Sequence, residues 1–110
     1  MDEAKFPIEF NNEIDEVKKS ENKIYTLAVD RLSKLAEGHN DISGGVINLK
    51  QPAKEHETSY IFEVTIIVYM GGSDQIISTE KGEQFQSTLD GALDAVERQV
   101  REFRNQQKNY

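Results

Sequence analysis

The apolar run at residues 60–70 is the feature that most constrains the fold of this chain. It is rich in β-branched and aromatic side chains, which favour an extended strand. Gly71 and Gly72 follow at once, and a glycine pair is typical of the tight turn of a β-hairpin. Residues 75–79 then form the returning strand. We therefore expect a central strand joined by a hairpin to an antiparallel neighbour.

Two shorter strands are expected before this hairpin. In the first, near the N-terminus, apolar residues alternate with others: Phe6, Ile8 and Phe10. Pro7 has no N–H to donate to a ladder, which favours an edge position. The other strand covers residues 46–49 and is entered through Gly44 and Gly45. Because this pair precedes a strand and not a helix, it indicates a bulge or flexible entry and not a phosphate loop.

Two segments have the apolar spacing of amphipathic helices. The first covers about residues 20–37 and follows a polar, acidic connection at 11–19. Its apolar stripe includes Ile24, Leu27 and Leu32, with Ser20 as the N-cap and Gly38 as the stop. The second runs from about Gln84 to Gln107. The order β-α-β-β-β-α predicts an α+β fold, with two helices on one face of a four-stranded, mostly antiparallel sheet.

The composition limits the class of protein. The 110 residues fit one domain, 1–110. The chain contains no cysteine, which excludes disulfides and thiolate metal sites. No apolar stretch approaches the roughly 18 to 20 residues that cross a bilayer, and the acidic start lacks the pattern of a secretory signal. We expect a cytoplasmic protein that has no membrane partner.

The formal net charge of -7 argues, taken as a sum, against a nucleic-acid binder. The distribution of charge along the chain matters more. Residues 1–16 carry six acids and one base, whereas residues 17–37 carry five bases and three acids, and residues 98–110 carry four bases and one acid. The positive charge is therefore concentrated in the two predicted helices.

Six basic residues on these helices are candidates for contact with RNA. They are Arg31 and Lys34 on the first helix, and Arg98, Arg101, Arg104 and Lys108 on the second. Arg101, Arg104 and Lys108 share one side, while Arg98 projects elsewhere. The plain structural alternative is that cations near a helix C-terminus complement the macrodipole. If the helices pack side by side, the two clusters merge into one basic strip, which suffices for recognition of folded RNA through its backbone.

Little in the sequence favours catalysis. His39 and His56 fall in polar segments typical of exposed loops, so neither is expected to be a base or a ligand. Asp90 and Asp94 lie one helical turn apart, with Glu97 nearby, and they project away from the apolar stripe onto a solvated acidic face. We expect no catalytic residue, no metal, no cofactor and no small-molecule substrate.

The order of these elements, together with two segments, resembles the ribosome hibernation factors, also called ribosome-associated translation inhibitors. One segment is 28–35, Ala-Val-Asp-Arg-Leu-Ser-Lys-Leu. The other is 80–94, Glu-Lys-Gly-Glu-Gln-Phe-Gln-Ser-Thr-Leu-Asp-Gly-Ala-Leu-Asp, followed by Glu-Arg-Gln at 97–99. The resemblance covers about residues 6–108. The chain is identified as similar to the short form of this family, also known as the sigma-54 modulation protein family.

The resemblance implies a double-stranded-RNA-binding-like fold and a non-enzymatic function. It implies binding to the small ribosomal subunit, through ribosomal RNA, in the channel of messenger and transfer RNA. Occupation of that channel blocks initiation and preserves idle ribosomes in stress or stationary phase. The family's basic positions match Arg31 and Lys34 on the first helix, and the four basic residues of the second helix. Two glutamines, Gln84 and Gln86, stand where the family usually has an aspartate and a tyrosine.

Two alternatives remain open. One is an acidic relative that keeps the fold but acts as a protein–protein interaction module without ribosome binding, as the acids at 1–16 and 81–97 suggest. The other is a metal-binding or small-ligand enzyme that uses Asp90 and Asp94. The sequence leaves the oligomeric state open.

Overall fold

The computed structural model describes residues 6–51 and 61–108, the last two of these by their backbone only. The strands are β1 (Ile8–Asn12), β2 (Ile42–Lys50), β3 (Phe62–Met70) and β4 (Gln75–Gly82). A short 3-10 helix, η1 (Asp15–Ser20), leads into α1 (Glu21–Ala36), and α2 (Phe85–Lys108) ends the described chain. The predicted order β-α-β-β-β-α is confirmed. His56 lies outside the described residues.

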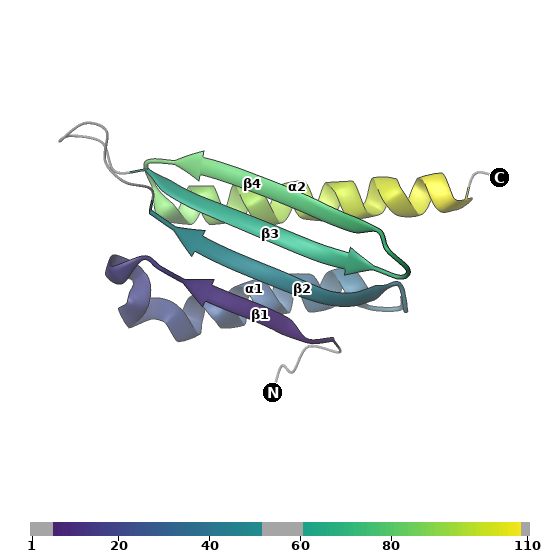
Figure 1. Cartoon of the computed structure of the whole chain (residues 1–110), viewed down its shortest axis with the longest axis horizontal. Coiled ribbons are helices and arrows are strands. Elements are labelled where there is room, and N and C mark those ends of the chain that lie inside the picture. The colour runs from purple at the N-terminus through teal and green to yellow at the C-terminus, as the bar shows by residue number, and fades with distance from the viewer. Residues whose placement is uncertain (1–5, 52–60, 109–110) are drawn as a thin grey trace.

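The four strands form one sheet in the order β1-β2-β3-β4. β1 pairs with β2 in parallel, and the other two pairs are antiparallel. Parallel neighbours need a crossover, which η1 and α1 supply. Figure 1 shows α1 and α2 on the same side of the sheet, with both helices starting at the same end. The predicted architecture, a mostly antiparallel sheet with both helices on one face, is confirmed.

The core lies between the sheet and the two helices, because one face of each strand and one stripe of each helix is apolar. On the strands the buried residues include Ile47, Leu49, Phe62, Val64, Ile66, Val68 and Met70; on the helices they include Ile24, Ala28, Leu32, Leu35, Leu89, Ala92, Leu93, Val96 and Val100. Leu27, counted in the predicted stripe, is 40% exposed. Ile14, in a connection predicted to be polar, is fully buried.

Several boundaries differ from the prediction. β2 begins at Ile42, so Gly44 and Gly45 lie inside the strand, and the predicted irregularity falls between Ile42 and Gly44. A Cβ at position 45 would lie 3.4 Å from the Ile67 carbonyl oxygen, at the edge of ordinary van der Waals contact, so the neighbouring strand leaves little spare room there. Ser20 occupies the N-cap position of α1 as predicted, but its side chain makes no capping hydrogen bond.

Two glycines with positive φ mark the end of α1 and the turn of the β3–β4 hairpin. Gly38 ends α1 with φ +76, in the left-handed region that glycine adopts without strain. The β3–β4 hairpin is confirmed, although its loop covers residues 71–74 and is therefore longer than the predicted tight turn. Its Gly72 has φ +83, and the Met70 N–H donates to the Asp74 carbonyl at 2.9 Å.

The sheet face opposite the helices carries cross-strand pairs of polar side chains. Asn11 donates to Asn48 at 2.8 Å, and the hydroxyls of Thr65 and Thr79 lie 3.0 Å apart. Lys81 lies 3.6 Å from Glu63 across the β3–β4 pair. The candidate RNA-binding residues all belong to the helices, and therefore to the opposite layer of the molecule.

Candidate nucleic-acid interface

Arg31 bridges the two helices. Its Nε and Nη2 donate to the two carboxylate oxygens of Glu97 at 2.8 and 2.9 Å, and Nη2 also donates to Asp94 at 2.7 Å. The Glu97 side chain is 17% exposed and that of Asp94 is 71% exposed. The hydrogen bonds that Arg31 donates to Glu97 raise the pKa of Arg31 above its ordinary value, against an opposing effect of burial. Arg31 is therefore a permanently charged link between α1 and α2.

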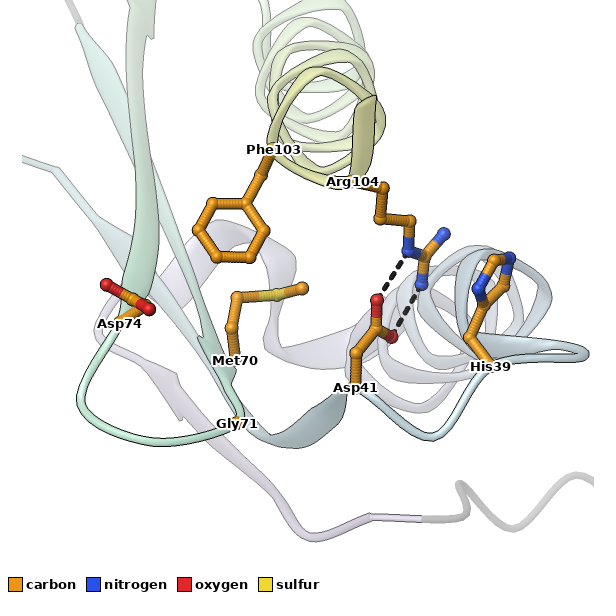
Figure 2. Close-up of a pocket in the computed structure, with 7 residues that line it drawn as sticks. All are labelled: His39, Asp41, Met70, Gly71, Asp74, Phe103 and Arg104. Carbon is orange, nitrogen blue, oxygen red and sulfur yellow. Dashed lines mark hydrogen bonds and ion pairs between the residues drawn. The ribbon is translucent and has the colours of Figure 1, made fainter. Parts of the chain in front are cut away.

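Arg104 is held at the other end of α2 by Asp41. Its Nε and Nη2 donate to the two oxygens of Asp41 at 2.7 and 2.9 Å, a bidentate pair (Figure 2). Asp41 precedes β2, and its carbonyl oxygen accepts the Gly71 N–H at 2.8 Å. The hydrogen bonds from Arg104 hold the pKa of the Asp41 carboxyl below its usual 3.8, although partial burial opposes them. The Asp41–Arg104 pair therefore links the C-terminal part of α2 to the end of the sheet at which β2 begins.

A hollow of about 340 Å³ opens beside this ion pair. Figure 2 shows the ring of Phe103 between Asp74 on one side and the Asp41–Arg104 pair on the other, next to Met70. Met70 is buried, whereas Asp74 is exposed. The lining thus combines an apolar floor with two carboxylates, one of which already has its cation. This arrangement does not favour an anionic ligand such as a phosphate.

The remaining candidate residues are more accessible. Lys34 is 73% exposed and lies 3.3 Å from Asp30, one turn earlier on α1. Arg98 and Arg101 are exposed, and neither forms an ion pair with any other residue that the structure describes. The side chain of Lys108 lies outside the described residues.

The predicted packing of the helices and the predicted basic strip have different outcomes. The helices do lie side by side, and Arg31 joins them. The strip is interrupted, however, because Asp94 and Glu97 lie between the basic residues of α1 and those at the end of α2. Glu97 was expected near a solvated acidic face, and it is instead largely covered and paired with Arg31.

Sequence reasoning named Glu97 but identified neither it nor Asp41 as the partner of an arginine. The local signal for Glu97 was its spacing of four residues from Arg101 on the same side of the helix, whereas its partner in the structure is Arg31, 66 positions away. Asp41 had no such local signal, since its partner Arg104 is 63 residues away and only the packing of α2 brings them together.

The other chemical sites considered gain no support. Among residues 6–51 and 61–108, no group of three or more metal-ligating side chains is present. Asp90 accepts a long hydrogen bond of 3.4 Å from Gln86, and His39 is exposed after α1. None of the helices in the described part of the chain has the length and apolarity needed to span a membrane.

Comparisons with known proteins agree with this architecture. The family model described as "Sigma 54 modulation protein / S30EA ribosomal protein" matches residues 15–108. Among solved structures, a ribosomal subunit interface protein from Coxiella burnetii superimposes with a TM-score of 0.68 at 14% identity. The match covers 91% of this chain and 99% of that one, and it shows that the two share a fold. No curated protein matches significantly in sequence.

Proposed function

The chain belongs to the Sigma 54 modulation protein / S30EA ribosomal protein family, and from this premise we propose that it is a translation inhibitor that binds the small ribosomal subunit. It occupies the channel of messenger and transfer RNA in the cytoplasm, under stress or in stationary phase, and contacts ribosomal RNA. It acts by occupying a site, as one molecule per ribosome, and not by catalysis. The observation that carries the proposal is the family match over residues 15–108.

The two exposed arginines of α2 are the first contacts in this proposal. Arg98 and Arg101 already extend into solvent, so a phosphate can approach them without breaking an existing ion pair. Lys34 joins them at small cost, because its pair with Asp30 is exposed and such pairs contribute little. Lys108 extends the same helix.

The two paired arginines contribute differently. Arg31 and Arg104 both use Nε and Nη2 for carboxylates, which leaves the N–H groups of Nη1 for a phosphate oxygen. The carboxylates lower the net charge that a phosphate meets at these two positions. We therefore assign them a dual role: they position the helices, and they make weaker contacts with RNA than their charge alone suggests.

Co-sedimentation with purified small subunits, at low and at raised salt, tests the proposal. A protein that neutralises phosphates releases counterions, so the logarithm of the association constant should fall linearly with the logarithm of the salt concentration. Lys50→Gln serves as a control for the loss of one positive charge away from the helices, because Lys50 is exposed at the end of β2. Absence of association at low salt would contradict the proposal.

A second candidate function has support from the charge balance. The net charge of -7 and the pairing of Arg31 with two acids favour a module that binds a basic protein. In that case small subunits should not co-sediment with the chain, and binding of the basic protein should survive Arg98→Gln with Arg101→Gln. That binding should instead be lost when the exposed acids Glu80 and Glu83 become glutamine. The two sets of variants therefore separate the candidates.

A further inference from the structure

A second hollow, of about 280 Å³, lies where the two helices begin. Its lining comes from η1 and the starts of α1 and α2: Val17, Ser20, Lys23, Ile24, Leu27, Phe85, Gln86 and Leu89. Figure 1 shows that both helices start at the same end of the sheet, which is why these residues meet. This starting groove lies at the opposite end of the helix layer from the Asp41–Arg104 pair.

The charge of the starting groove is unlike that of the rest of the chain. The sequence holds 20 acids and 13 bases, yet the lining includes one charged residue, Lys23, and no acid. A shallower hollow beside it shares Lys23 and Leu27, and its acid, Asp30, is paired with Lys34 at 3.3 Å. An anionic ligand would therefore meet a cation here without a competing carboxylate in the groove wall.

The floor and one rim of the groove are apolar. Ile24 and Leu89 are buried at its base. Phe85 is half-buried and packs edge-on against Phe62, with ring centroids 5.9 Å apart. Leu27, in contrast, is 40% exposed at the rim between the two hollows. Apolar surface of this kind suits a flat, weakly polar group that leaves water.

Polar groups without strong partners surround this apolar surface. Ser20 lies at the N-cap of α1 but makes no capping hydrogen bond. The Gln86 amide is exposed, and its one bond within the described residues is the long contact with Asp90 at 3.4 Å. Together with Lys23 they offer donors to a phosphate at the positive end of the α1 dipole and an amide to a heterocycle.

We propose that the starting groove binds one unpaired nucleotide of an RNA. The base lies on Leu27, Phe85 and Ile24, and the Gln86 amide bonds to its edge. Lys23 and Ser20 hold the adjoining phosphate at the start of α1. Single-stranded bases are recognised in proteins by such a combination of apolar contact, edge hydrogen bonds and backbone charge. The inference rests on the proposed function in one respect, namely that the partner is RNA.

The chemistry of the groove favours a nucleotide over an apolar protein side chain. A purely apolar partner would offer no hydrogen bond or charge to Lys23, Ser20 and Gln86 at the rim, whereas a nucleotide can bond to all three. The hollow beside Phe103 differs, since two carboxylates line it and Arg104 is already paired with one of them. A phosphate would therefore meet a competing carboxylate there and none in the wall of the starting groove.

An NMR titration of the full, isotope-labelled chain tests the inference. The probes are a single-stranded hexaadenylate RNA, adenosine monophosphate, and an RNA duplex of the same length. We expect the single strand to shift the signals of Leu27 and Gln86, and the duplex to leave them in place. Lys23→Gln should weaken binding of the single strand about tenfold, as expected for loss of a charge-assisted contact. Gln86→Ala should weaken it about threefold, because a neutral hydrogen bond contributes less.

Controls separate the groove from the charge of the helices. Leu27→Ser changes an exposed side chain and should weaken the single strand without altering the fold, whereas Lys50→Gln should have no effect. Equal binding of the duplex, unchanged binding by the Lys23 and Gln86 variants, or absence of shifts at Leu27 and Gln86 with the single strand would each overturn the inference. The proposed function is judged separately: ribosome association without shifts at Leu27 defeats the groove alone, and shifts at Leu27 without ribosome association defeat the proposed function alone.

Discussion

The four arginines of the helix layer that the structure describes fall into two kinds. Arg31 and Arg104 are partly buried and held by carboxylates at 2.7 to 2.9 Å. Arg98 and Arg101 are exposed, without an ion pair in the described part of the chain. The residue type is the same, but the surroundings differ. An arginine next to a half-buried carboxylate stabilises the fold, whereas one in solvent is available to a polyanion.

The largest effect should come from replacing a paired arginine. Arg31→Gln leaves Glu97 covered and without its cation, so the free energy of unfolding should fall by about 2 kcal/mol. Arg98→Gln should change it by less than about 0.5 kcal/mol. Urea unfolding measures both, through a lower midpoint at an unchanged slope. Equal losses in the two variants would remove the distinction drawn between the two kinds of arginine.

Replacing both exposed arginines should have the next largest effect, and on binding. Arg98→Gln combined with Arg101→Gln should weaken association with small subunits about tenfold, because each phosphate contact is a charge-assisted hydrogen bond. The salt dependence of the logarithm of the association constant should become shallower by about 1 to 2 units. An unchanged slope in co-sedimentation would show that these arginines contact no phosphate.

Asp41→Asn should have a smaller effect on stability. The variant keeps the size of the side chain but removes the charge that accepts both bonds from Arg104, and should cost about 1 to 2 kcal/mol. Thermal or urea unfolding at neutral pH measures the loss. Glu83 is an exposed acid directly after β4, so Glu83→Gln is the matched control, and its free energy of unfolding should stay near that of the wild type.

The same pair predicts a pH dependence. The pKa of Asp41 is lower in the folded chain than its ordinary 3.8, so the pair contributes its full stability above that value. This contribution is lost as the pH falls through the lowered pKa, below about pH 4. The wild type should therefore lose more stability than Asp41→Asn over this acidic range. Parallel curves for the two proteins would contradict the assignment.

A modest increase in affinity for small subunits is expected when one of the two carboxylates that pair with Arg31 is removed. Asp94 is 71% exposed, so Asp94→Asn removes one competing carboxylate from Arg31 at little structural cost. Association with small subunits should strengthen about twofold to threefold, and Glu83→Gln should show how much of this follows from net charge alone. Weaker association of the Asp94 variant would mean that the carboxylate does not compete with RNA.

The smallest effect concerns the pair on the surface of α1. Asp30 and Lys34 are 44% and 73% exposed, so Asp30→Asn should change the free energy of unfolding by less than about 0.5 kcal/mol. A chemical denaturation curve that superimposes on that of the wild type would agree with this. A shift as large as that of Asp41→Asn would show that exposure does not separate the two pairs.

Much of the fold was predictable, because it depends on local patterns. The alternation at residues 62–70 places Phe62, Val64 and Ile66 on the helix-covered face, and Gly38 and Gly72 mark a helix end and a turn. The prediction was wrong for Ile14 and Leu27. The hydrophobic period alone does not determine the exposure of either side chain. Ile14 is buried because the chain turns back through η1. Leu27 is exposed because its side of α1 faces the groove between the helices.

The candidate site was predictable only as a set of residue types. The basic residues of the helices could be named from the sequence, and so could the side of the helix on which Arg101 and Arg104 lie. Their partners could not. Arg104 meets Asp41 across 63 positions, and Arg31 meets Glu97 across 66, so only the packed structure shows which charges are available.

By itself the sequence determined the elements, their order and the layer to which each basic residue belongs, because hydrophobic period and turn residues act over a few positions along the chain. Tertiary structure alone decided which arginines are neutralised and that the two helix starts enclose a groove without acids. The physical reason is that electrostatic interaction depends on distance in space and on exclusion of water, and both are set only once the helices have packed on the sheet.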